Sequence, residues 1–137
     1  MKKYNVGIIG YGWVATAHNA AINATNQGQV TAIYSSRKLN DAELSAKWGS
    51  PIKSYTSLAE MLKHPGLDTV SICSYPNQHR EHAIAAANAG KNLIIEKPLS
   101  LSWKDCLAVE AAVKKNKVKT CVCFECRYSN QITVTKA

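Results

Sequence analysis

Several residue types and patterns are scarce in this 137-residue sequence, and each scarcity excludes a class of protein. No run approaches the roughly 18 consecutive apolar residues of a membrane span, and the N-terminus lacks the small-residue cleavage site of a secretory leader. Aromatic residues make up only 7% of the chain and form no spaced stacking platform for nucleic acid. The chain is also short for a two-domain enzyme. We therefore expect one cytoplasmic domain with no membrane partner.

Acidic residues are fewer than basic ones, 9 against 17, which gives a formal net charge of +8. An excess of this kind can indicate a nucleic-acid partner. The lysines are dispersed, however, and the one cluster, residues 114–117, lies at the end of a predicted helix, where cations interact favourably with the helix dipole. We expect these charges to be solvated and predict no nucleic-acid partner.

Cysteines are present in an odd number, five, and Cys123-x-x-Cys126 has the spacing of a metal-binding or redox pair. A zinc site would need a second pair of ligands, which no neighbouring segment supplies. Cys121 and Cys123 alternate within a predicted strand, so we expect both to point to one buried face as small apolar groups. The sequence thus predicts no metal site.

Predicted strands and helices alternate along the chain. Alternation of this kind indicates an α/β fold, a doubly wound parallel sheet of about six strands. Asn77 is expected to cap the fourth helix. We assign residues 1–126 to one domain and expect 127–137 to begin the connection to a second domain that is absent from this chain. Hydrophobic runs, capping boxes and breaks predict strands at 6–9, 30–34, 52–55, 69–73, 92–96 and 118–124, and helices at 13–24, 40–49, 57–63, 77–89 and 102–116.

A glycine-rich turn follows the first predicted strand. Gly10-x-Gly12-x-x-Ala15 stands between a strand and a helix, the context in which this pattern binds a dinucleotide. The first glycine allows the tight turn, the second lets backbone amides approach the pyrophosphate, and the helix N-terminus supplies free N–H groups. An ordinary strand-to-helix turn is the alternative. The candidate cofactor-binding residues here are Gly10, Gly12, Trp13 and Val14.

The end of the second predicted strand bears on the choice of cofactor. An acidic residue there would bind the ribose 2′-hydroxyl of NAD, whereas an arginine would accommodate the 2′-phosphate of NADP. This sequence has Ser36 and Arg37 at that place and no carboxylate before Asp41. We therefore expect NADP, with NAD as the alternative.

A charged pair followed by proline, Glu96-Lys97-Pro98, ends the fifth predicted strand. Because ligands bind at the carboxyl ends of parallel strands, this motif is expected to face the same crevice as the glycine turn. Hydride transfer to a nicotinamide requires a hydroxyl proton to leave, and a lysine can stabilise the developing alkoxide or relay the proton. Lys97 is thus the candidate catalytic residue, with a pKa that burial would lower. Pairing with a nearby carboxylate is the alternative, and a cis Lys97–Pro98 bond would aim the side chain.

Taken together, these residues resemble the Gfo/Idh/MocA oxidoreductases, which include glucose-fructose oxidoreductase and inositol dehydrogenase. The resemblance covers essentially the whole chain. Tyr75 departs from the threonine often found before Pro-Asn in this family. The resemblance rests on four segments in order: the turn at 10–15, the block ICSYPNQH at 72–79, the helix end AGK at 89–91 and EKPL at 96–99.

The resemblance implies that residues 1–126 form a dinucleotide-binding domain with a Rossmann fold and that the absent second domain is an α+β substrate domain. It also assigns roles to particular residues. Lys97 matches the family's active-site lysine, and Glu96 matches a residue beside the nicotinamide ribose. Arg127 falls where the last strand leads to the substrate side. His79, at the start of a helix, either contacts the cofactor loop or is simply exposed. That loop matches the segment containing Ser74, Tyr75, Pro76 and Asn77.

The activity implied by the resemblance is NAD(P)-dependent hydride transfer to or from a hydroxyl or ketone of a sugar, cyclitol or similar polyol. We expect a homo-oligomer only when the second domain is present. The 137-residue chain alone is expected to be nearly inactive, because the family's acid–base histidine belongs to that domain. A non-catalytic dinucleotide sensor or regulatory module is the alternative. A methyltransferase with a similar glycine turn is weaker, since it would not account for Glu96-Lys97-Pro98.

Overall fold

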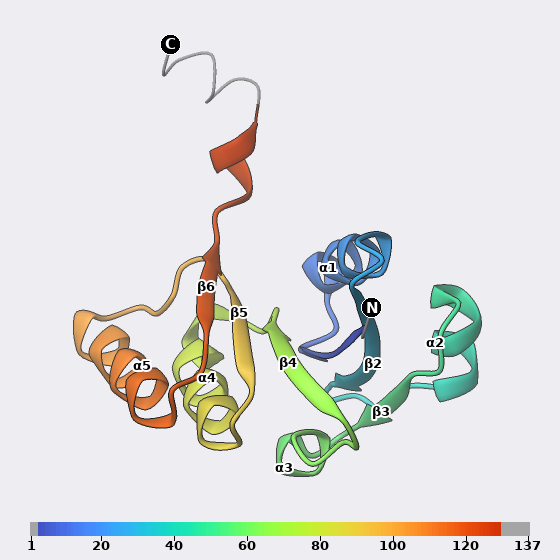
Figure 1. Ribbon diagram of the computed structural model, residues 1–137, viewed down its shortest axis with the longest axis horizontal. Coiled ribbons are helices and arrows are strands. Elements are labelled where there is room, and N and C mark those ends of the chain that lie inside the picture. Colours follow the sequence, from blue (N-terminus) through green and yellow to red (C-terminus); the bar gives the residue numbers. More distant parts are fainter. Residues whose placement is uncertain (1–2, 130–137) are drawn as a thin grey trace.

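Six parallel strands form the sheet of the computed structural model, which describes residues 3–129. They lie in the order β3-β2-β1-β4-β5-β6 (Figure 1), so the strand order reverses between β1 and β4. The doubly wound parallel sheet predicted from the sequence is confirmed. The strands are β1 (Tyr4–Ile9), β2 (Gly28–Tyr34), β3 (Lys53–Tyr55), β4 (Leu67–Ile72), β5 (Asn92–Glu96) and β6 (Thr120–Cys123).

Helices connect the strands, and capping side chains set the starts of α2, α3 and α5. As the sequence predicts, Asn40, Ser57 and Ser102 each accept a hydrogen bond from a backbone N–H in the first turn of the helix that follows. No helix in the described part of the chain is long and apolar enough to cross a membrane. The helices are α1 (Trp13–Ala24), α2 (Asp41–Trp48), α3 (Leu58–Met61), α4 (His79–Asn88) and α5 (Trp103–Asn116).

The start of α4 differs from the prediction. Asn77 does not cap this helix; it lies inside a 3-10 turn, η1 (Pro76–Gln78), and Gln78 precedes α4 without a side-chain hydrogen bond to the helix. Pro76 explains the difference, because its fixed φ suits the first position of a helical turn. The helical segment therefore begins at the proline, one residue before Asn77.

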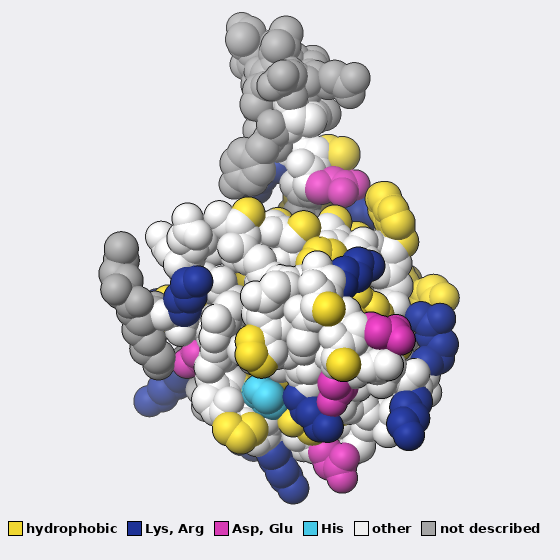
Figure 2. Space-filling model, turned by 90° about the vertical axis from the view of Figure 1, so that its right-hand side faces the viewer, with side chains coloured by type: hydrophobic (Ala, Val, Ile, Leu, Met, Phe, Trp, Pro, Cys, Tyr) yellow, Lys and Arg dark blue, Asp and Glu magenta, His cyan; other side chains and the backbone are white. Residues whose placement is uncertain are grey.

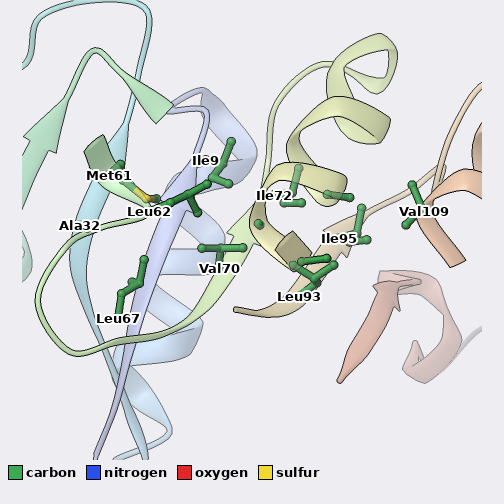
Figure 3. Close-up of a cluster of buried hydrophobic side chains, with 13 residues drawn as sticks. Ile9, Ala32, Met61, Leu62, Leu67, Val70, Ile72, Leu93, Ile95 and Val109 are labelled. Carbon is green, nitrogen blue, oxygen red and sulfur yellow. The ribbon is translucent and has the colours of Figure 1, made fainter. Parts of the chain in front are cut away.

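Helices cover both faces of the sheet, and each face has its own buried cluster. Since successive residues of a strand point to opposite faces, Ile8 packs with residues of α1 and α2, whereas Ile9 packs with residues of α3, α4 and α5. Figure 3 shows the cluster around Ile9, where Met61 and Leu62 at the end of α3 lie over β1 and β2. This close packing holds the central strands in register and so places their carboxyl ends at one rim.

The two cysteines of the edge strand β6 are less buried than the sequence predicts. Cys121 is exposed and Cys123 is only half-buried, so the prediction that both point to a buried face is wrong. β6 pairs only with β5, and an edge strand is covered less completely than the central strands. Alternation correctly predicted that the two side chains share a side, but not what covers that side.

Basic and acidic side chains are interspersed on the face drawn in Figure 2. Arg80 of α4 pairs with Asp105 of α5, and Lys114 pairs with Glu110 one turn earlier in α5. Two positive charges, one of them from the basic cluster, are therefore partly balanced by carboxylates of α5, on the side of the molecule away from that face.

Asp41 at the start of α2 ties this helix to β3. One carboxylate oxygen accepts hydrogen bonds from the backbone N–H and the hydroxyl of Ser54, and the other contacts the Lys53 ammonium at 2.8 Å. Burial by itself would raise the pKa of Asp41, but these partners outweigh it and hold the pKa below its ordinary value.

We predict that Asp41→Asn lowers the free energy of unfolding near neutral pH by about 1 kcal/mol, since the lost charge-assisted hydrogen bonds are partly exposed to solvent. Because the folded-state pKa is depressed, the wild-type contribution is complete above the ordinary pKa of Asp and is lost as the pH falls through the folded value. Urea unfolding at about pH 7 and about pH 3 measures both effects. Glu110→Gln, which breaks an exposed pair within one helix, is the control and should cost less than about 0.5 kcal/mol. A loss for Asp41→Asn that is equal at both pH values would contradict the prediction.

Candidate cofactor-binding and active site

The candidate site lies where the strand order reverses. β1 and β4 are parallel neighbours with Ile9 opposite Ile72, so the loops after both strands start at the same rim. Gly10 has a φ of +87°, and a Cβ added to it would lie 2.8 Å from the Ser74 Cα. Only glycine fits this conformation and this close approach of two backbones. The tight turn predicted at Gly10 is therefore required by the packing of the two loops.

The N-terminus of α1 opens onto this rim. Gly12 precedes the helix, makes no side-chain hydrogen bond to its free N–H groups, and is followed by a first turn without acidic residues. A Cβ added to Gly12 would meet nothing within 4 Å, so the space in front of the helix is open. Free N–H groups and the helix dipole together make such a terminus suited to an anion such as a pyrophosphate.

A hollow of about 660 Å³ lies between the ends of β1, β2 and β4. Trp13 and Tyr75 border it and are highly exposed, at 87% and 76%, so they present apolar surface to anything bound there. Three segments that are far apart in the sequence thus meet at one place. The hollow brings together eight of the predicted cofactor-binding residues: Gly10, Gly12, Trp13, Val14, Ser36, Arg37, Ser74 and Tyr75.

The hollow is also lined by residues that were not predicted as site residues from the sequence. His82 stands one helical turn after His79, and its Nδ1 lies 2.8 Å from the Ser74 hydroxyl. Burial lowers the pKa of His82, so its ring is neutral near pH 7 (ordinary value about 6.5). The available signal was proximity in the sequence: each of these residues lies within two positions of a predicted site residue or one turn away on the same helix. They are Tyr11, Tyr34, Ser35, Cys73, Gln78 and His82.

Arg37 lies between this hollow and a smaller one of about 440 Å³, which Lys38 also lines. The Arg37 backbone N–H donates to the Ser35 hydroxyl, and its guanidinium Nη2 donates to the Tyr11 carbonyl at 3.2 Å. Asp41, the first carboxylate after β2, is engaged by partners on β3. The end of β2 therefore presents cations, and no free carboxylate, to the rim.

A larger hollow of about 830 Å³ lies elsewhere, between the start of α2 and β3. Its polar residues Asp41, Lys53 and Ser54 already bind one another. β3 is an edge strand, two strands from the point where the order reverses. We therefore place the candidate site at the rim of β1 and β4, where ligands of this fold type bind.

Lys97 follows β5 on the same rim. β5 pairs in parallel with β4, with Ile95 opposite Ile72, which puts Lys97 at the carboxyl ends of the strands, two strands from Gly10. The Lys97–Pro98 bond is cis. The expectation that Lys97 is buried is wrong: its side chain is exposed because the residue lies just beyond the sheet. No ion pair of Lys97 occurs among residues 3–129, so the alternative of a pairing role finds no support there.

Glu96 is buried, at 8% exposure, and its carboxylate is turned toward α1. One oxygen lies 2.8 Å from Nε2 of His18, and the other accepts the backbone N–H of Lys97 at 3.1 Å. Its role beside a nicotinamide ribose stays a prediction. The sequence did not indicate the contact with His18, because 78 residues separate the two side chains.

His79 is buried, at 1% exposure, so the expectation of an exposed helix-terminal histidine is wrong. Its Nδ1 lies 2.7 Å from the Pro98 carbonyl oxygen, and its Nε2 lies 3.0 Å from the Ser74 carbonyl oxygen. One ring thus joins the loop after β4 to the loop after β5, which is why it is covered from both sides. His79 touches the predicted cofactor loop through the Ser74 backbone.

The remaining predicted site residues lie outside the hollow. Pro76 and Asn77 belong to η1, which follows Tyr75. Arg127 is exposed and lies in a second 3-10 turn, η2 (Glu125–Tyr128). Residues 130–137, most of the predicted connection to a second domain, lie outside the described residues.

His18, Glu96 and Cys123 each present a metal-ligand atom, and the three atoms lie within 4.8 Å of one another. The His18–Glu96 contact is already a direct hydrogen bond of 2.8 Å. Burial raises the pKa of the Cys123 thiol, which favours its protonated form. We interpret His18 and Glu96 as a hydrogen-bonded pair beside Lys97, with Cys123 next to it.

Comparison with known proteins agrees with this geometry. A model of the oxidoreductase family with an NAD-binding Rossmann fold, GFO_IDH_MocA, matches residues 4–124. The chain is 33% identical to 4-carboxy-2-hydroxymuconate-6-semialdehyde dehydrogenase of Sphingobium sp. over 119 residues, 87% of this chain and 36% of that protein. It is 32% identical to myo-inositol 2-dehydrogenase of Thermotoga maritima, over 87% of this chain and 34% of that protein.

A solved structure shares the fold as well. A probable dehydrogenase from Thermotoga maritima superimposes with a TM-score of 0.83 at 32% identity, covering 96% of this chain and 39% of that one. The chain spans about a third of the length of the curated relatives named above. Both relatives are named as dehydrogenases, and the family model covers the glycine turn, the loop after β4 and Glu96-Lys97-Pro98. The chain therefore belongs to the Gfo/Idh/MocA family of oxidoreductases and forms its NAD-binding Rossmann domain.

Proposed function

We propose that this chain holds a nicotinamide dinucleotide across the ends of β2, β1 and β4. We propose further that Lys97 serves hydride transfer between this cofactor and a hydroxyl or ketone of a sugar, cyclitol or similar polyol. The observation that carries the proposal is the common rim: the open helix N-terminus at Gly12 and the exposed amine of Lys97 lie at the same ends of two parallel strands, β1 and β5, with β4 between them. The open cradle at Gly12 fits a bound diphosphate.

In this proposal, different residues along the rim have different roles. When bound, the nicotinamide would supply the hydride acceptor or donor. The N–H groups at the start of α1 would bind the diphosphate, and Trp13 and Tyr75 would shield it from water. The Lys97 ammonium would donate a hydrogen bond to the substrate oxygen and stabilise the negative charge that builds there as the hydroxyl proton passes to the acid–base histidine that the family resemblance places in the second domain.

Relatives support the oxidoreductase class and bear on the substrate. One relative is named for myo-inositol, a polyol, and another for a semialdehyde. We favour a polyol because a hydroxyl gives Lys97 an oxygen on which charge develops. The alternative of a non-catalytic sensor draws no support from relatives that are named as dehydrogenases. The cytoplasmic location and the dependence of oligomers on a second domain stay predictions.

For the cofactor we propose NADP over NAD. Arg37 and Lys38 place two cations at the end of β2, and the hydroxyl of Ser36 lies beside them. A 2′-phosphate carries the negative charge and acceptor oxygens that suit an arginine fork. Asp41 is held by β3, so no carboxylate is free there to bind a 2′-hydroxyl.

We predict that the chain binds NADPH more tightly than NADH and that Arg37→Gln weakens NADPH binding by about tenfold or more, while NADH binding changes by less than about threefold. Quenching of tryptophan fluorescence measures both, since Trp13 borders the hollow. Arg80→Gln, which removes an arginine paired with Asp105 on α4 and α5, is the matched control and should leave both affinities unchanged. Tighter NADH binding by the wild type would contradict the preference.

Gly12→Ala is predicted to keep the fold and lose the dinucleotide. Gly12 has a φ of −101° and free space around its Cβ position, so the free energy of unfolding should change by no more than about 1 kcal/mol. The new methyl group would stand where the diphosphate approaches the backbone, and we expect binding to weaken by at least about tenfold. Calorimetric titration and thermal unfolding measure the two effects.

Gly10→Ala, in contrast to Gly12→Ala, is predicted to destabilise the fold. Its positive φ and the 2.8 Å approach to the Ser74 Cα predict a loss of about 3 kcal/mol or more of folding stability. Gly49→Ala, at a positive φ of +68° in open space, is the control and should cost only about 1 kcal/mol. Undiminished dinucleotide binding by Gly12→Ala would contradict the proposed diphosphate site.

Lys97→Met tests the catalytic role in the protein that carries this chain. We predict that kcat for NADP-dependent oxidation of the best polyol in a panel falls by at least about 100-fold, because the stabilisation of the alkoxide is lost. The dissociation constant for NADPH should change by less than about threefold, since the diphosphate end is untouched. Lys91→Met, on the opposite rim before β5, is the control. Unchanged turnover in Lys97→Met would favour a role without chemistry.

A further inference from the structure

His18 of α1 has a set of contacts that no role described so far explains. Its side chain is 15% exposed and lies between β4 and β5. Nδ1 lies 2.7 Å from the Ser71 hydroxyl of β4, and Nε2 lies 2.8 Å from the Glu96 carboxylate of β5. Both ring nitrogens of a half-buried histidine are therefore engaged by side chains of the strands that carry the two loops of the site.

The alternation of the strands explains why these groups meet. Ile72 and Ile95 are paired neighbours that point to the face of α3, α4 and α5. The residues beside them, Ser71 and Glu96, must then point to the opposite face, where α1 lies. His18 is one helical turn after Ala15, which is buried in the cluster under α1, so its ring extends over the same face.

The hydrogen bonds form a chain in which each donor has an acceptor. Burial raises the pKa of Cys73 to about 12, so its thiol keeps a proton and can donate to the Ser71 oxygen at 3.7 Å. The Ser71 hydroxyl can then donate to Nδ1 of His18, and Nε2–H can donate to Glu96. The second oxygen of Glu96 is left to accept the backbone N–H of Lys97. The chain thus ends on the backbone of the candidate catalytic residue.

The same residues cannot act as the catalytic triad of a hydrolase. Serine, histidine and glutamate in this order resemble a nucleophile with its base and orienting acid. Ser71, however, is completely buried at 0% exposure, so its hydroxyl cannot meet a substrate. The side chains of Ser71, His18 and Glu96 therefore have a structural role in holding one another in place.

We propose that His18 is a positioning residue for Lys97. It holds the Glu96 carboxylate, and Glu96 holds the Lys97 backbone N–H at the point where β5 leaves the sheet. His79 secures the next residue through the Pro98 carbonyl, so the loop that carries the exposed Lys97 side chain is anchored on both sides. The long side chain then has a fixed base from which to reach the cofactor. This inference rests on the proposed function only for the identity of the cofactor and substrate that the Lys97 side chain reaches.

The direct test follows the Lys97 amide by NMR-detected hydrogen exchange in the whole chain. His18→Leu should speed exchange of the Lys97 N–H by about tenfold or more, because the carboxylate that accepts this hydrogen bond loses its partner. His18→Gln should restore protection to within about threefold, since its amide can donate to Glu96 in place of Nε2–H. His64→Leu is the matched control: it removes another half-buried histidine bonded to one side chain, Tyr55, and should leave Lys97 unchanged.

A second measurement distinguishes a loss of Lys97 positioning from a general loss of structure in His18→Leu. His18→Leu should lower kcat for polyol oxidation by about tenfold or more in the protein that carries this chain, but leave the binding of NADPH and of 2′-phospho-ADP-ribose, which lacks the nicotinamide, within about threefold. Unchanged Lys97 exchange in His18→Leu would overturn the inference, and so would faster exchange throughout the chain with weaker binding of both ligands. If the wild type binds neither ligand, the proposed function fails, whereas the exchange measurement still decides the role of His18.

Discussion

The parallel pairing of β1 with β4 is the constraint on which the site depends. It brings the loops after these strands so close that Gly10 touches the Ser74 backbone. Backbone hydrogen bonds from Gly10 to the Tyr34 carbonyl and from Cys73 to the Ile9 carbonyl continue the rim across β2, β1 and β4. A side chain at the glycine would separate the two loops. The orientation of α1, whose free N–H groups face the rim, follows from the same contact.

The two ends of the proposed site are built in different ways. At the phosphate end, backbone amides of α1 are left without partners, so the binding groups are rigid and belong to the main chain. At the reactive end, the Lys97 side chain is exposed while its backbone is held by Glu96, and the neighbouring carbonyl by His79. Fixed anchors around a free amine lower the ordering entropy that a long side chain loses when it engages a ligand.

Helix α1 links these ends. Its first turn faces the proposed diphosphate position, and Ala15 in the same turn packs against the sheet in an apolar cluster. One turn later, His18 reaches Glu96. The sheet face under this helix changes from apolar at β1 and β2 to polar at β4 and β5. A shift of α1 would therefore disturb the phosphate-binding amides and the support of Lys97 together.

The sequence by itself determined the order of the elements, the parallel sheet, the glycine turn and the rim on which Lys97 stands. These follow from local periodicity, from capping residues such as Asn40, and from the rule that the ends of parallel strands coincide. Only the tertiary structure decided which side chains are covered: His79 is buried, whereas Cys121 and Lys97 are exposed. Burial and side-chain partners depend on segments far apart in the sequence, as the contact of Glu96 with α1 shows, and no local pattern encodes which of those segments will meet.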